Sequence, residues 1–178
     1  MVSANNLFNF FSIIAISGAI SIMIGAGMRQ EHNLNTAYQI KLIGYIVSAL
    51  GVLLLSAYNI SIKALSSIGW GSILLTPFFS SYLTIGVLIY IIALTVKYKK
   101  KILEASAHAS VSDTSDPYNN LSTLLSTSIF IQIILFVVFS AYNSEYLGIK
   151  YLLIMSNIAN VGLALIIKLY LQVYMTEG

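Results

Sequence analysis

Residues 121–142 read LSTLLSTSIFIQIILFVVFSAY and contain no charged side chain. A helix rises ~1.5 Å per residue, so this stretch is long enough to cross the roughly 30 Å hydrocarbon core of a bilayer. Lipid offers no partner for backbone amides, so the stretch is expected to be a transmembrane α-helix. Its apolar residues form a continuous run, which argues against an alternating strand of a β-barrel.

Four further stretches are also long and apolar, at about 7–28, 42–58, 71–96 and 151–174, and of these only the last contains a charged residue, Lys168. The composition agrees, because only 8% of the residues are charged and 58% are hydrophobic, whereas a soluble domain carries about 25% charged residues. The first stretch lacks the basic flank of a signal peptide and is expected to be a retained span. We predict an all-α, polytopic transmembrane helical bundle of five spans. It would form a single multi-pass membrane domain over residues 1–178.

The basic residues are divided unevenly between the predicted loops. The loops after the first and third spans hold six of them: Arg29, Lys41, Lys97, Lys99, Lys100 and Lys101. The opposite side holds Lys63 and Lys150. Because cytoplasmic loops are enriched in Lys and Arg, this bias predicts an N-terminus outside and a C-terminus inside.

The longest predicted loop, residues 97–120, lies on the inner side. It begins with the lysines Lys97, Lys99, Lys100 and Lys101. We expect a basic helical continuation of the third span there, whose lysines bind anionic lipid headgroups. A polar linker follows, and Asp116-Pro117 is a typical start of the next helix.

Small residues recur in the first two spans at spacings that suit close helix packing. Ser17, Ser21 and Gly25 share one face of the first span, and Gly44, Ser48 and Gly51 share one face of the second. We expect these faces to pack against other helices. A pore lining is the alternative.

The tetrapeptide Ser-Ala-Tyr-Asn ends both the second span, at 56–59, and the fourth, at 140–143. Two duplicated helical hairpins would produce such a repeat. Chance is the simpler interpretation, because Tyr favours the membrane interface.

The third span carries hydroxyl side chains at every fourth residue: Ser72, Thr76, Ser80 and Thr84. Pro77 lies among them and is expected to kink the helix. Such a stripe either packs against neighbouring helices or borders a polar pathway, and we favour packing.

The fifth span has the most polar face of the five. Lys150, Asn157, Asn160, Lys168 and Gln172 fall on one side of the helix at ~100° per residue. Lys168 lies near the helix end and can extend to the headgroups, but Asn157 and Asn160 lie deeper. We expect them to hydrogen-bond across helices, with Gln132 of the fourth span as a partner.

The residues that membrane enzymes and proton-coupled carriers use are missing from the predicted spans. No span contains Asp or Glu, and the only histidines, His32 and His108, lie in loops. The chain has no cysteine, which excludes disulfides, thiolate metal ligands and a cysteine nucleophile. No catalytic or phosphate-binding motif is present. We expect no enzymatic activity, cofactor, metal or nucleic-acid partner.

Three functional hypotheses follow. The leading one is a non-catalytic structural subunit that packs against other membrane proteins, or against itself, in a larger assembly such as a virion inner membrane or an organellar complex. The second is a small channel or carrier whose path runs between the third and fifth helices. The third is a membrane-anchored adaptor that captures partners through the 97–120 loop.

Overall fold

The structure of the chain, a computed structural model, describes residues 4–28, 33–63, 79–111, 117–142 and 147–173. These residues form six helices and no strand. The helices are α1 (Ala4–Gly27), α2 (Leu34–Lys63), α4 (Phe79–Lys97), α5 (Lys99–Val111), α6 (Pro117–Ala141) and α7 (Leu147–Val173). All but α5 are long and apolar enough to cross a membrane. The predicted all-helical fold of five spans is therefore confirmed.

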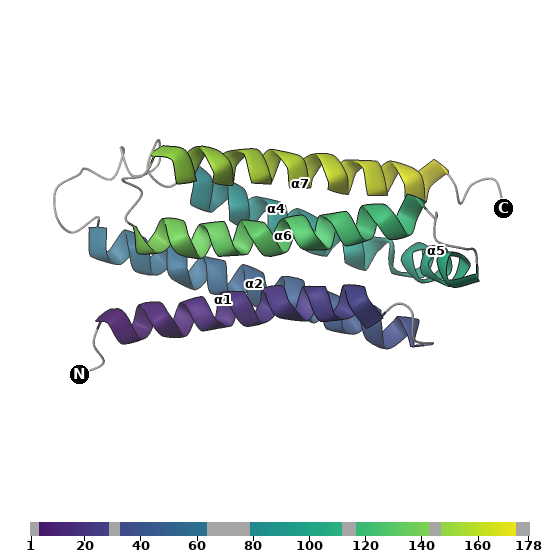
Figure 1. Ribbon diagram of the computed structural model, residues 1–178, viewed down its shortest axis with the longest axis horizontal. Coiled ribbons are helices and arrows are strands. Elements are labelled where there is room, and N and C mark those ends of the chain that lie inside the picture. Colours follow the sequence, from purple (N-terminus) through teal and green to yellow (C-terminus); the bar gives the residue numbers. More distant parts are fainter. Residues whose placement is uncertain (1–3, 29–32, 64–78, 112–116, 143–146, 174–178) are drawn as a thin grey trace.

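The five long helices lie side by side along one axis, and the short α5 lies at one end of the bundle (Figure 1). We call this the α5 end; α2 and α6 begin there, and α4 and α7 end there. In the order α1, α2, α4, α7, α6, each helix contacts the next, and α6 contacts α1. The helices thus form a closed ring. Helices α2 and α6, which are not neighbours in this order, also contact each other across its interior.

Large apolar side chains fill the interior of this ring. The most deeply buried include Tyr45, Leu55, Leu88, Ile133 and Phe136, each at most 2% exposed. Such packing leaves the bundle axis occupied by side chains, as in the cores of other well-packed proteins.

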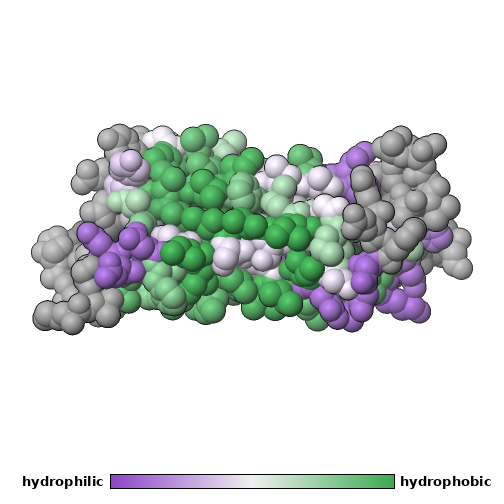
Figure 2. Space-filling model, turned by 60° about the horizontal axis from the view of Figure 1, so that its bottom comes forward, coloured by the Kyte–Doolittle hydropathy of each residue, from purple (hydrophilic) through white to green (hydrophobic). Residues whose placement is uncertain are grey.

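The outer surface of the bundle is also apolar. Figure 2 shows a continuous hydrophobic band across the middle of one face, with hydrophilic residues gathered toward the two ends. Each long helix contributes large exposed hydrophobic side chains, among them Ile13, Ile46, Ile89, Ile131 and Met155. A band of this kind suits a hydrocarbon environment, because it would be unfavourable in water.

The closest helix pair is α1 with α2, and glycines make the approach possible. A Cβ atom on Gly18 would lie 2.4 Å from the Ser48 backbone nitrogen, and one on Gly51 would lie 2.4 Å from that of Ala15. Gly25 and Gly44 face the opposite helix at similarly short range. Backbones approach this closely only where side chains are absent, as in other membrane helix pairs.

The predicted packing face of small residues is correct for α2 but only partly correct for α1. Gly25 faces α2, whereas Ser17 is exposed and Ser21 is only partly buried. Their hydroxyls donate to the Ile14 and Ser17 carbonyls of their own helix. A hydroxyl satisfied in this way can face lipid, so small polar residues alone did not identify the packed side.

Two segments differ from their predicted boundaries at the α5 end. Helix α2 begins at Leu34 instead of near residue 42, and the Asn33 side chain caps it by accepting a hydrogen bond from the Thr36 amide across 3.4 Å. Lys41 therefore lies within a helix and not in a loop. The predicted continuation of the third span is a separate helix, α5, because the chain turns at Tyr98.

Candidate functional site

Amide side chains from two helices form a hydrogen-bonded network inside the bundle. Gln132 of α6 donates to the Asn157 carbonyl oxygen of α7 across 2.6 Å. Asn160 of α7 in turn donates to the carbonyl oxygen of Gln132. Asn157 also donates across 3.0 Å to Thr84 Oγ1 of α4. We call these four residues the amide network, and it joins three transmembrane helices.

Each helix orients its own member of the network. The Asn157 amide nitrogen also donates to the Leu153 carbonyl at 2.8 Å, one turn earlier in α7. The Thr84 hydroxyl donates to the Ser80 carbonyl at 2.7 Å, one turn earlier in α4. The side chains are therefore anchored to the backbone before they meet across helices, which limits the entropy lost on pairing.

All four side chains of the amide network are 0% exposed. A buried amide is stabilised only when its donors and acceptors are paired, and most of these are. The Asn160 carbonyl oxygen and the Ser80 hydroxyl have no hydrogen-bond partner among the described residues. The network is therefore enclosed and nearly satisfied.

The structure brings together four of the predicted polar residues and leaves the others apart. The four are Thr84, Gln132, Asn157 and Asn160. Ser80 lies one turn from Thr84, and its side chain is also buried. Ser72, Thr76 and Pro77 lie outside the described residues. The predicted polar face of the fifth span divides, because Lys168 is only partly buried and Gln172 donates instead to the Tyr98 hydroxyl across 3.0 Å.

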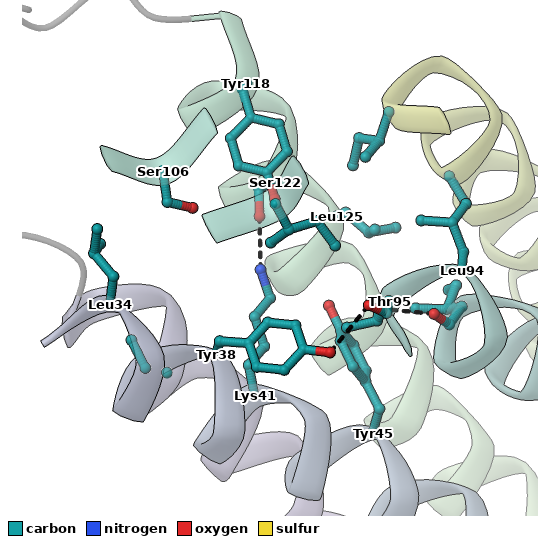
Figure 3. Close-up of a pocket in the computed structure, with 16 residues that line it drawn as sticks. Leu34, Tyr38, Lys41, Tyr45, Leu94, Thr95, Ser106, Tyr118, Ser122 and Leu125 are labelled. Carbon is teal, nitrogen blue, oxygen red and sulfur yellow. Dashed lines mark hydrogen bonds between the residues drawn. The ribbon is translucent and has the colours of Figure 1, made fainter. Parts of the chain in front are cut away.

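A second polar cluster, which sequence reasoning missed, surrounds a cavity of about 50 Å³ at the α5 end. Lys41 of α2 points across it to Ser122 of α6, with 2.6 Å between Nζ and Oγ (Figure 3). Beside it, the Tyr38 hydroxyl donates to the Thr95 carbonyl of α4 across 3.0 Å. None of the amide network residues lines this cavity. Assigning Lys41 to a loop concealed the cluster.

The four clustered lysines have different surroundings. The Lys100 side chain is 92% exposed and lies 3.8 Å from Glu104, one turn along α5. Lys97 and Lys99 are exposed, and the Lys99 ammonium lies 5.6 Å from the centroid of the Tyr38 ring. Lys101 is partly buried and donates to the Leu171 carbonyl in the last turn of α7 across 3.0 Å. This contact pairs a cation with the negative end of a helix.

Asn59, the last residue of the first Ser-Ala-Tyr-Asn copy, contacts Ser140, the first residue of the second, at the end of the bundle opposite α5. The Asn59 side chain of α2 donates to the Ser140 hydroxyl of α6 across 3.0 Å. This pair and the Lys41–Ser122 pair have the same sequence separation of 81 residues. Helices α2 and α6 therefore run parallel and in register along most of their length.

The described residues contain no group of three or more acidic or histidine side chains that could hold a metal ion. Comparison of the chain with protein families, curated proteins and solved structures gives no match. The physical character of these polar clusters is therefore the basis for a functional proposal.

Proposed function

We propose that the chain is a non-catalytic structural subunit that packs laterally in a larger membrane-embedded assembly. The observation that supports this function best is the amide network. Its side chains are fully buried, and they bond one another instead of facing water. Polar residues used in this way hold transmembrane helices in fixed positions, each contact contributing on the order of 1 kcal/mol.

Two further features support a rigid scaffold. The α1–α2 pair meets backbone against backbone at Gly18 and Gly51, and large side chains fill the interior of the helix ring. Closely packed interiors deform little, so a bundle of this kind can present a fixed outer surface to its neighbours.

The outer helices provide the surface for lateral contacts. Helices α1 and α7 bury little of their surface. In each, only 28% of the apolar stretch that could cross the membrane is buried inside the bundle. The outward side of α7 carries Met155 (64% exposed), Ile158 (58%) and Leu169 (58%). We propose that neighbouring membrane proteins, or further copies of this chain, pack against these flanks in a virion inner membrane or an organellar complex. The exposed lysines of α4 and α5 would then bind anionic headgroups.

A channel or carrier remains the second candidate. One observation favours it: the Asn160 carbonyl oxygen and the Ser80 hydroxyl are buried without partners among the described residues. A water or a solute passing between α4 and α7 would supply such partners. This hypothesis requires the amide network to be open to water.

Site-specific photo-crosslinking in the native membrane tests the proposed function. A photoreactive residue at Met155 or Ile158 should give discrete protein adducts, whereas one at the buried Ile133 should give none. The same adducts should persist in mild detergent and be identified by mass spectrometry. If every exposed position gives only lipid adducts and the purified protein sediments as a monomer, a structural role in an assembly is ruled out.

A further inference from the structure

The cavity at the α5 end is the feature that the structural role does not use. All six described helices contribute to its wall. Its volume of about 50 Å³ is larger than the ~10–15 Å³ needed for one water molecule. It can therefore hold several waters or one small polar group.

The cavity wall is positively charged and rich in hydroxyl groups. Lys41 lies on it, within the span Leu34–Ile60, and its ammonium is a cation with three N–H donors. The hydroxyls of Ser106 and Ser122 also line it. Ammonium and hydroxyl donors in this number suit a group with several anionic oxygens.

The surroundings of the cavity add to its positive potential. The Lys99 ammonium lies 5.6 Å from the ring of Tyr38, which is itself part of the wall. Two helices begin at this cavity, because Leu34 is the first residue of α2 and Tyr118 the second residue of α6. The N-terminal ends of α2 and α6 favour an anion here, but Gly25 and Thr95 place the C-terminal turns of α1 and α4 at the same cavity. The helix dipoles therefore largely offset one another, and the positive charge comes from the lysines.

The remaining wall is apolar and lies toward the α5 end of the spans. Leu94, Leu125 and Ile167 line it, in the halves of their respective spans that are nearer to α5. A ligand with an anionic head and an apolar body matches such a wall better than a fully hydrated ion does.

We propose that this cavity binds a phosphate group and that an anionic phospholipid supplies it. The phosphate oxygens would accept hydrogen bonds from the Lys41 ammonium and from the Ser106 and Ser122 hydroxyls. The phosphate would fill the cavity, and the glycerol and acyl chains would extend out of it along the apolar outer surface of the bundle. This site differs from binding at the exposed lysines, because it requires Lys41 and an open cavity.

Native mass spectrometry of the full-length protein in mild detergent tests the site. Phosphatidylglycerol, phosphatidylcholine and inorganic phosphate are titrated separately, and phosphate is also used as a competitor. The variants are Lys41→Gln and Ser106→Leu, the latter of which fills the cavity and retains the ammonium. Lys150→Gln is the matched control, because it removes the same charge from the first turn of α7, at the end of the bundle opposite the cavity.

The site predicts that the wild type retains phosphatidylglycerol at least about tenfold more tightly than phosphatidylcholine, as expected for a charge-assisted contact. Lys41→Gln and Ser106→Leu should each abolish this preference, and Lys150→Gln should change it by less than about twofold. Binding of inorganic phosphate alone, lost in Lys41→Gln, would support the phosphate site with a free anion as its ligand. Equal retention of phosphatidylglycerol by the wild type, Ser106→Leu and any folded Lys41→Gln protein would overturn the proposal.

Discussion

Gln132 and Asn157 lie on different transmembrane helices, and a hydrogen bond of 2.6 Å joins their side-chain amides. Both side chains are 0% exposed. Thr84 and Asn160 extend this contact to a third helix and to a second turn of α7. The relationship identifies the four residues of the amide network as contacts between helices. Several measurable consequences follow from it.

Replacement of Gln132 by Ala should destabilise the bundle. It leaves the Asn157 carbonyl oxygen and the Asn160 amide without their partner, at a cost of about 1–3 kcal/mol in the free energy of unfolding. Equilibrium unfolding in mixed detergent micelles measures this change. Thr127→Val is the control on the same helix, since the hydroxyl of the partly buried Thr127 donates to the Thr123 carbonyl of α6 itself. A Gln132→Ala protein as stable as Thr127→Val would show that the network contributes nothing.

The glycines of the α1–α2 pair should tolerate no side chain. Gly18→Ala would place a Cβ atom 2.4 Å from the Ser48 backbone nitrogen, so the helices must separate. A loss of about 1–3 kcal/mol is expected, as for other overpacked interiors. Gly86→Ala on α4 is the matched control, because nothing lies within 4 Å of its Cβ position. That change should instead be neutral or stabilise the helix by about 0.5–1 kcal/mol. Equal melting temperatures for the two variants would contradict the close α1–α2 approach.

The Lys101 ammonium should stabilise the last turn of α7 against opening. Lys101→Gln removes the cation from the Leu171 carbonyl, at an expected cost of about 0.3–1 kcal/mol. Hydrogen exchange of the last turn of α7 should accelerate in this variant, whereas Lys100→Gln should leave it unchanged. Faster exchange in both variants would indicate a general effect of charge instead of a helix cap.

The parallel register of α2 and α6 can be tested with paired cysteines, since the chain has none of its own. Asn59→Cys with Ser140→Cys should be joined readily by a short thiol-reactive crosslinker, because the native side chains are in contact at 3.0 Å. Asn59→Cys with Phe136→Cys, one helical turn away, should react more slowly. The register would be wrong if the second pair reacted faster than the first.

The sequence was sufficient to predict the spans and the central polar contact. Long uncharged runs indicate lipid-crossing helices, and deep amides such as Gln132, Asn157 and Asn160 have no partner in lipid except one another. The charged flanks were harder to interpret. Hydropathy marks where charged residues begin, but a helix can continue beyond that point, as α2 does around Lys41.

The packed face of α1 was only partly predicted, for a different physical reason. Ser17 and Ser21 have the spacing of a seam, but their hydroxyls are satisfied by carbonyls of the same helix. The true packing face uses Ala15, Gly18 and Gly25. Of these only Gly25 was predicted, and the two missed residues have no side-chain hydroxyl. Side-chain size and polarity do not reveal which partner a hydroxyl will choose. The cavity at the α5 end was likewise hidden, because it depends on contacts among six helices.

The most direct test of the central claim is the water accessibility of the amide network. A Thr84→Cys protein in its native membrane is treated with a membrane-impermeant, charged thiosulfonate from each side, and Lys100→Cys serves as the exposed reference. An enclosed clamp between helices predicts rapid modification of Lys100→Cys and no modification of Thr84→Cys from either side. Modification of Thr84→Cys at a rate comparable to the reference would show a water-filled path between α4 and α7, and would contradict the structural role.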